Sequence, residues 1–120
     1  MLGRRKKIGS IAEEEAVRYL QELGWKLVQR NYRCRIGEID IIARDPRGFL
    51  VFVEVRSRSG KGYGSPEESV VSRKQHKLRL LANQYLQAHP RDSEGPCRID
   101  VLAVTFEGDS KIINHIINAF

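Results

Sequence analysis

Asp40 and Glu54 are acidic residues that lie inside two apolar segments, 37–43 and 49–55, which have the alternation typical of strands. Turn-forming residues at 45–48 separate the two segments, so we expect an antiparallel hairpin. Side chains two positions apart share a face of a strand, and a register with an odd number of loop residues, or with a bulge, places both carboxylates on one face. This register predicts three facing pairs: Asp40 with Glu54, Ile42 with Phe52, and Glu38 with Arg56.

Two facing carboxylates are suited to binding a divalent cation. Their mutual repulsion amounts to about 1 kcal/mol or less, and a cation between them reverses its sign. Mg²⁺ takes a few carboxylate oxygens together with waters. The sequence therefore predicts a site for Mg²⁺, or Mn²⁺, at Asp40 and Glu54. The alternative is that Asp40 is solvated and that Glu38 and Arg56 form an ordinary surface pair.

A helix is expected at 10–23, with Glu13 inside its apolar sector. A carboxylate on an apolar face is costly unless a partner satisfies it. Glu13 can complete a capping box with Ser10, or it can reach Asp40 and Glu54 directly or through water. The two explanations are compatible, and the sequence favours neither of them.

A second helix is expected at 72–88, where Lys74 lies at the N-terminal end of the apolar stripe. The ammonium group of this lysine can neutralise a carboxylate or steady a reacting phosphate. The alternative is a lysine whose stem covers the edge of the core while its charge reaches water.

The order of the expected elements indicates an α/β fold, in which helices flank a mixed central sheet. In chain order the elements are a helix at 10–23, strands at 25–33, 37–43 and 49–55, a helix at 72–88, and a strand at 97–106. A last short strand or helix is expected at 112–117. The length predicts one domain over residues 1–120, in which residues 1–8 form a basic, flexible arm.

The charge of the chain is basic, with 21 Lys and Arg against 15 Asp and Glu and a net charge of +6. Such a balance favours a polyanionic partner, nucleic acid first. Six basic residues near the acids are the candidates for contacts with nucleic acid: Arg33, Arg35, Arg58, Lys61, Arg73 and Lys77. No apolar run approaches the ~20 residues that span a bilayer, and the basic N-terminus lacks the apolar stretch of a secretory signal. We therefore expect a cytoplasmic protein without membrane contact.

Several short motifs carry a resemblance to a known family. They are Ala12-Glu-x-x-Ala16, Arg30-Asn-Tyr32, Gly37-Glu-Ile-Asp40, Val51-Phe-Val-Glu-Val55, Lys74-Gln75 and Arg98-Ile-Asp100. With these residues the sequence resembles the YraN-type family of uncharacterised bacterial proteins over nearly the whole chain. That family is similar to a branch of the PD-(D/E)XK restriction-endonuclease-like superfamily, with a layout close to that of archaeal Holliday-junction resolvases.

The resemblance implies an αβββαβ core and an endonuclease that hydrolyses DNA phosphodiester bonds, with a role in DNA repair or recombination. It implies that Asp40, Glu54 and Glu13 are catalytic residues that hold the metal, which activates a water for attack on the phosphodiester. By analogy with the resolvases it implies a homodimer. The alternatives are a nucleic-acid-binding protein that retains the fold without hydrolysis, and a scaffold whose acids only cap and pair.

One position departs from the superfamily pattern, because Arg56 stands where a lysine is expected. Arginine keeps its proton at working pH and cannot act as a base, although it can bind phosphate or stabilise charge in a transition state. Lys74 is the candidate substitute, so Arg56 and Lys74 complete the set of expected catalytic residues. Asp100 also belongs to the family pattern, and we expect it to be a buried partner within its strand.

Overall fold

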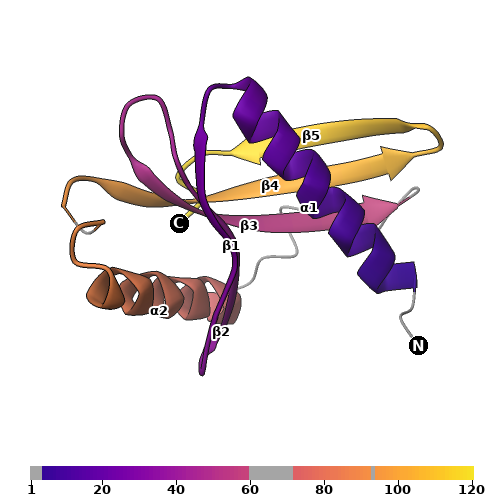
Figure 1. Cartoon of the computed structure of the whole chain (residues 1–120). Coiled ribbons are helices and arrows are strands. Elements are labelled where there is room, and N and C mark those ends of the chain that lie inside the picture. Colours follow the sequence, from indigo (N-terminus) through magenta and orange to yellow (C-terminus); the bar gives the residue numbers. More distant parts are fainter. Residues whose placement is uncertain (1–3, 60–71, 93) are drawn as a thin grey trace.

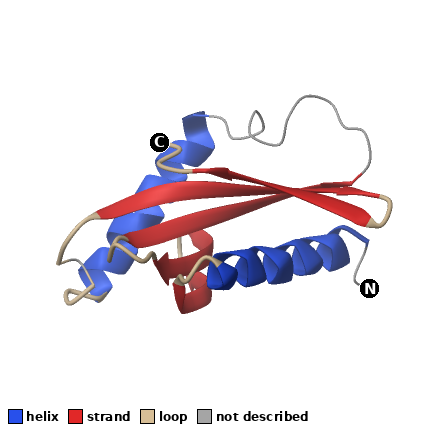
Figure 2. Cartoon of the chain, turned by 90° about the horizontal axis from the view of Figure 1, so that it is seen from above, coloured by secondary structure: helices blue, strands red, loops and turns tan. Residues whose placement is uncertain are grey.

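Two helices cover opposite faces of a five-stranded sheet in the computed structural model, which describes residues 4–59, 72–92 and 94–120 (Figure 1, Figure 2). The elements are α1 (Arg4–Glu22), β1 (Lys26–Cys34), β2 (Gly37–Arg44), β3 (Leu50–Ser59), α2 (Ser72–Ala88), β4 (Cys97–Glu107) and β5 (Ser110–Ile116). The strands lie in chain order across the sheet, with β3 and β4 parallel and the other neighbours antiparallel. The mixed α/β fold and the αβββαβ order predicted from the sequence are confirmed, and β5 follows them as a strand.

Each helix packs its apolar stripe against one face of the sheet. Leu20 of α1 shares a buried cluster with Val53 of β3, whereas Leu81 of α2 shares a second cluster with Phe52 of the same strand. Consecutive residues of a strand point to opposite faces, which is why neighbours on β3 enter different clusters. Glu54 follows the parity of Phe52, so the sheet directs this acid towards α2 and away from the larger part of α1.

The β2–β3 hairpin has the register that the sequence predicts over its closed end. Ile42 lies opposite Phe52, and the last pair before the loop joins Arg44 to Leu50. The loop between them comprises five residues, 45–49, an odd number. Its turn is closed by the Asp45 amide, which donates to the Phe49 carbonyl oxygen at 3.0 Å. The loop length therefore places the acids of β2 and β3 on one face, as expected.

The first helix begins earlier than the sequence predicts. It starts at Arg4, not near Ser10, so residues 4–8 belong to the helix. Arginine and lysine have high helix propensity, which outweighs the unfavourable position of basic residues near a helix N-terminus. Glu13 therefore lies well inside α1, and the capping box with Ser10 is not what explains its inward position.

Gly24 ends α1 in a Schellman motif. Its backbone has a φ of 87°, its amide donates to the Gln21 carbonyl oxygen at 3.0 Å, and the Trp25 amide donates to that of Leu20 at 3.0 Å. We expect Gly24→Ala to lower the free energy of unfolding by about 1 kcal/mol, because a Cβ is strained in this conformation. Urea unfolding followed by circular dichroism measures the change, and an unaltered midpoint would contradict the expectation.

Candidate functional site

A cavity of about 220 Å³ opens between β2, β3 and the first half of α2. Charged residues from all three elements line it: Glu38, Asp40, Glu54, Lys74 and Lys77. Leu78 and Leu81 of α2 close its apolar side. Three of the expected catalytic residues, Asp40, Glu54 and Lys74, therefore share one cavity with Lys77, an expected contact for nucleic acid.

Asp40 and Glu54 are in direct contact at the centre of this cavity. A hydrogen bond joins their carboxyl groups, and Asp40 Oδ2 also accepts the Val55 amide at 2.8 Å. Burial raises the pKa of Asp40 to about 8, with further contributions from the hydrogen bond and the negative charge of Glu54. The amide of Val55 opposes this rise, and the charge of Glu13 adds to it. The two carboxyl groups therefore share a proton when no cation lies between them.

Lys74 and Arg56 both approach the same oxygen of Glu54. Lys74 Nζ lies 2.9 Å from Glu54 Oε2 and Arg56 Nη2 lies 3.7 Å from it. This oxygen accepts no hydrogen bond among the described residues, and its partners there are the ion pairs with Lys74 and Arg56. The side chain of Glu54 is only 8% exposed, so solvent reaches it poorly. A buried carboxylate oxygen that accepts no hydrogen bond and is balanced only by neighbouring cationic side chains is available to a metal cation.

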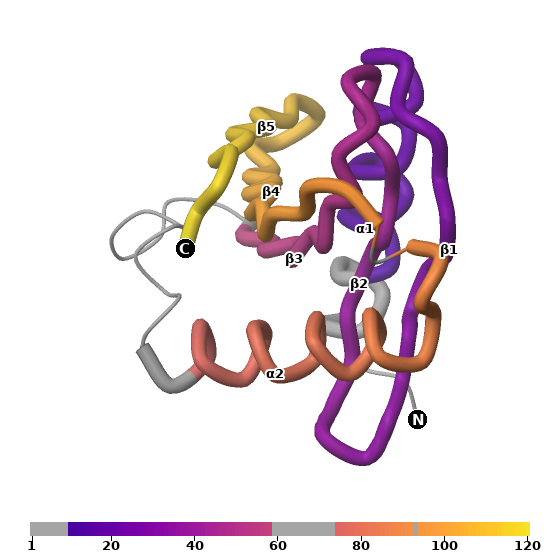
Figure 3. The backbone as a smooth tube through the Cα atoms, turned by 90° about the vertical axis from the view of Figure 1, so that its left-hand side faces the viewer, coloured from indigo at the N-terminus to yellow at the C-terminus, as the bar shows by residue number. Residues whose placement is uncertain are grey.

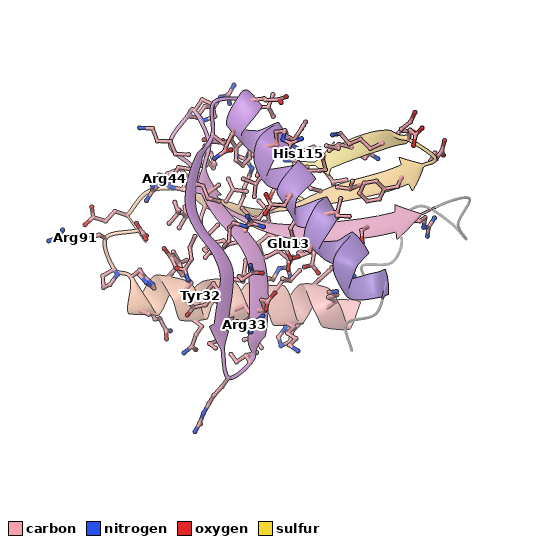
Figure 4. All side chains as sticks on the ribbon, turned by 45° about the vertical axis from the view of Figure 1, so that its right-hand side comes forward. Glu13, Tyr32, Arg33, Arg44, Arg91 and His115 are labelled. Atoms are coloured by element: carbon pink, nitrogen blue, oxygen red, sulfur yellow. The ribbon has the colours of Figure 1, made fainter. Side chains whose placement is uncertain are left out.

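Glu13 enters the site from α1 and meets a further acid there. Oxygens of Glu13, Glu38 and Asp40 all lie within 4.8 Å of one another. Burial raises the pKa of Glu13, the charge of Arg30 opposes the rise, and the charge of Glu38 adds to it. Figure 4 shows Glu13 on α1 beside the hairpin of β1 and β2. Of the two explanations for the position of Glu13, the structure therefore favours the one in which its carboxylate reaches Asp40.

Glu38 is a member of the site that the sequence reasoning assigned elsewhere. The expected pair of Glu38 with Arg56 is wrong, because Glu38 Oε2 accepts Arg33 Nε at 2.6 Å. The pairing of β2 with β3 ends at Ile41 and Val53. Beyond this pair β2 continues with β1 as a two-stranded ribbon past α2 (Figure 3). The signal in the sequence was the spacing of two between Glu38 and Asp40, which puts both acids on one face.

These donors fit a divalent cation. All of them are carboxylate oxygens, which hard cations such as Mg²⁺ and Mn²⁺ prefer. Glu54 Oε2 accepts no hydrogen bond from the described part of the chain, and burial raises the pKa of Asp40, so a further cation would stabilise both carboxylates. Glu13 and Glu38 bring two further carboxylates to the same side of Asp40. The arrangement can hold a cation next to a bound phosphate, with Lys74 at its edge.

Comparison with known proteins identifies the family of the chain. Residues 12–104 match the uncharacterised protein family UPF0102. The chain belongs to this family. A UPF0102 protein of Desulforamulus reducens is 56% identical over 117 residues, with 96% of each chain covered. A UPF0102 protein of Pelotomaculum thermopropionicum is 46% identical over the whole of both chains. The expected resemblance to an uncharacterised bacterial family is confirmed.

Two solved structures resemble this UPF0102 chain at low identity. The structure of an EndoMS–dsDNA complex has a TM-score of 0.41 and 18% identity, and the match covers 75% of this chain and 33% of that one. The structure of Pyrococcus furiosus SfsA with Ca²⁺ has a TM-score of 0.36 and 18% identity, covering 88% of this chain and 58% of that one.

Among the described basic residues of this family member that are expected to touch nucleic acid, Lys77 lines the cavity, and the exposure of the others differs. Arg35 is exposed in the turn between β1 and β2, and Arg33 is exposed but paired with Glu38. Lys77 is an exposed residue that also lines the cavity, whereas Arg58 is half-buried on β3. Lys61 lies outside the described residues, and so does the side chain of Arg73, although its backbone belongs to α2.

Asp100 lies on the opposite face of the sheet, away from the cavity. It is fully buried and accepts from Arg98 Nε at 2.9 Å and from the Asn118 amide at 2.9 Å. Its second oxygen lies 2.8 Å from His115 Nε2, and His115 Nδ1 lies 3.2 Å from the Tyr19 hydroxyl. Asp100 is thus a buried partner that joins β4 to β5 and the C-terminal segment, as the sequence predicts.

Proposed function

We propose that this chain is a metal-dependent endonuclease that hydrolyses phosphodiester bonds in DNA. The observation that carries the proposal is the convergence of Asp40, Glu54 and Lys74 on one cavity, with Glu13 close to Asp40, where Glu54 Oε2 accepts no hydrogen bond from a described residue. Acidic residues that are costly to the fold and lie beside a cation are typical of sites that act on phosphates.

Four acids would hold the cation, which we propose to be Mg²⁺ or Mn²⁺. Asp40 and Glu54 are central, and Glu13 and Glu38 complete the set from α1 and the start of β2. When bound, the cation supplies Lewis-acid stabilisation of the charge that develops on the phosphate. The carboxyl pair loses its shared proton as the cation binds, so binding releases a proton.

Lys74 and Arg56 have different roles in the proposed reaction. Lys74 comes from α2 and carries a flexible ammonium group 2.9 Å from Glu54, so it can move from the carboxylate to a phosphate oxygen. Arg56 stays protonated and can only donate hydrogen bonds to the phosphate or to Glu54. Lys74 is therefore the residue of the two that could transfer a proton to or from a reacting group.

The basic residues around the cavity would bind the DNA backbone. The net charge of +6 supplies attraction for a polyanion, and Arg35 and Lys77 are exposed beside the acids. Arg33, Arg58, Lys61 and Arg73 are further proposed contacts. The described helices include none that could span a bilayer by its length and apolar character. The cytoplasmic location, the homodimer, the single domain and the role in repair or recombination stay predictions.

Cleavage of DNA tests the proposal. We expect the purified protein to cut at least one substrate among duplex, branched and single-stranded DNA when Mg²⁺ or Mn²⁺ is present. Glu54→Gln keeps the shape of the side chain and should reduce the rate by about 100-fold or more. Glu107→Gln, an exposed position at the far end of β4, is the matched control and should cut like the wild type.

The same experiment separates the alternatives. Equal cleavage by Glu54→Gln and the wild type would exclude the proposed site. Salt-dependent DNA binding without cleavage of any substrate would instead favour a nucleic-acid-binding protein that retains the fold. Absence of both binding and cleavage at moderate salt would leave a scaffold.

A further inference from the structure

Asn31 has an unusual backbone conformation in the middle of β1. Its φ of 53° lies in the left-handed region, which residues other than glycine, asparagine and aspartate rarely adopt. The flanking pairs join Arg30 to Ile41 and Tyr32 to Ile39, so Asn31 stands across from Asp40 on the neighbouring strand. A strained residue beside a cluster of acids points to a functional constraint.

The side chain of Asn31 links two acids of the site. With the amide nitrogen facing the carboxylates, Asn31 donates to Glu13 Oε1 and to Glu38 Oε1, each at 3.2 Å. One of these acids comes from α1 and the other from β2, so one amide connects two elements. Both acids have an oxygen within 4.8 Å of one on Asp40. The amide thus offsets part of the repulsion in a group of close negative charges.

The left-handed turn of the backbone explains how this contact forms. In a regular strand, neighbouring side chains point to opposite faces. Here Arg30 and Asn31 both reach Glu13, with Arg30 Nη2 at 3.7 Å and the Asn31 amide at 3.2 Å from the same Oε1. The change in φ at Asn31 therefore brings two consecutive side chains to one carboxylate. An ordinary strand residue at this position would lose that arrangement.

We propose that Asn31 is a positioning residue of the metal site, which fixes Glu13 and Glu38 so that their remaining oxygens face a cation. This inference rests on the proposed function, because it needs a cation at these acids. The independent sign that the neighbouring site takes a ligand is Glu54 Oε2, which among the residues that the structure describes accepts no hydrogen bond in a side chain that is 8% exposed and has only ion pairs with Lys74 and Arg56 to balance it. Residues that hold ligands in place commonly change metal affinity by about 10–100-fold when they are replaced.

Calorimetric titration of the metal-free protein with Mn²⁺ tests the inference without requiring activity. Asn31→Gly removes the amide and tolerates the φ of 53°, so the fold should persist while the Kd rises by about 10–100-fold. Asn31→Ala removes the same amide and strains the backbone, so it should lower the metal-free Tm further and raise the Kd equally. Asn118→Gly is the matched control, because Asn118 has a φ of 55° and lies outside the acid cluster.

Three outcomes are decisive. Weaker Mn²⁺ binding in both Asn31 variants, with an unchanged Kd in Asn118→Gly, supports the positioning role. A Kd within twofold of the wild type in Asn31→Gly would overturn it and leave Asn31 as a structural link alone. A wild-type protein that binds no Mn²⁺ would overturn the proposed metal site and this inference together.

Discussion

Asp40→Asn is expected to make the protein more stable at pH 8 and to abolish its response to divalent cations. The folded protein raises the pKa of Asp40 from its ordinary 3.8 to about 8, first by burial and then through Glu54. The neutral form is therefore favoured in the fold. An asparagine reproduces it, since its oxygen can accept the Val55 amide and its nitrogen can donate to Glu54.

The sign of the pH dependence follows from this raised pKa. The stabilisation from protonated Asp40 is fully present below the ordinary pKa of 3.8 and is lost as the pH rises through about 8. The stability difference between Asp40→Asn and the wild type should therefore grow from near zero at pH 4 to about 2 kcal/mol or more at pH 8. Urea unfolding at a series of pH values measures it, with Asp109→Asn, an exposed position, as the control.

The cation response is the second half of this expectation. Mg²⁺ or Mn²⁺ should raise the Tm of the wild type, and more so at pH 8 than at pH 6, because binding displaces the shared proton. Asp40→Asn should show no shift, since an amide is a far weaker ligand than a carboxylate. A variant that is destabilised at pH 8, or one that keeps the cation shift, would refute our description of the carboxyl pair.

Asp100→Ala is expected to cost a large share of the stability of the fold. It would leave the positive charge of Arg98, whose side chain is 12% exposed, without its partner inside the strand. The Asn118 amide would lose its acceptor as well. Breaking a buried ion pair from one side costs about 3–5 kcal/mol. Arg98 Nη1 also donates to Asp45 at 2.8 Å, so the arginine would keep one ionic partner in the variant. We therefore expect a loss near the lower end of this range.

The network also predicts sensitivity to acid. Burial acts to raise the pKa of Asp100, but hydrogen bonds from His115, Arg98 and the Asn118 amide outweigh it, and the net pKa is lowered. The stabilisation is present above the ordinary pKa of an aspartate and is lost as the pH falls through the lowered value. Wild-type stability should therefore fall in acid, whereas Asp100→Ala should show a smaller fall.

Thermal and urea unfolding of Asp100→Ala and Asp100→Asn test the network, with Asp109→Ala as an exposed control. Asp100→Asn keeps one acceptor and should lose less, so it remains measurable if the alanine variant does not fold. Mn²⁺ affinity should stay unchanged in Asp100→Asn, because Asp100 lies on the face of the sheet opposite Glu54. A stability loss below about 1 kcal/mol in both variants would show that the network contributes little.

The sequence by itself determined the elements and the central pair of the site. Alternation along two strands and an odd loop length are local properties, and together they put Asp40 and Glu54 on one face. The apolar stripe of α2 likewise predicted that Lys74 faces inward, and it lies 2.9 Å from Glu54. The first helix ends within one residue of its expected end at 23, because the conformation of Gly24 that stops it needs only local geometry.

Tertiary structure alone decided the rest of the site. Glu38 joins Glu13 because β2 parts from β3 beyond Ile41 and because the packing of α1 brings Glu13 close to the acids of β2. Neither feature can be predicted from the alternation of side chains along a single strand. The link through Asn31 depends on a reversal of φ that interrupts the alternation from which side-chain directions are inferred. A rule that assigns faces by counting residues holds only while the strand stays regular, and here the strand is irregular where the acids meet.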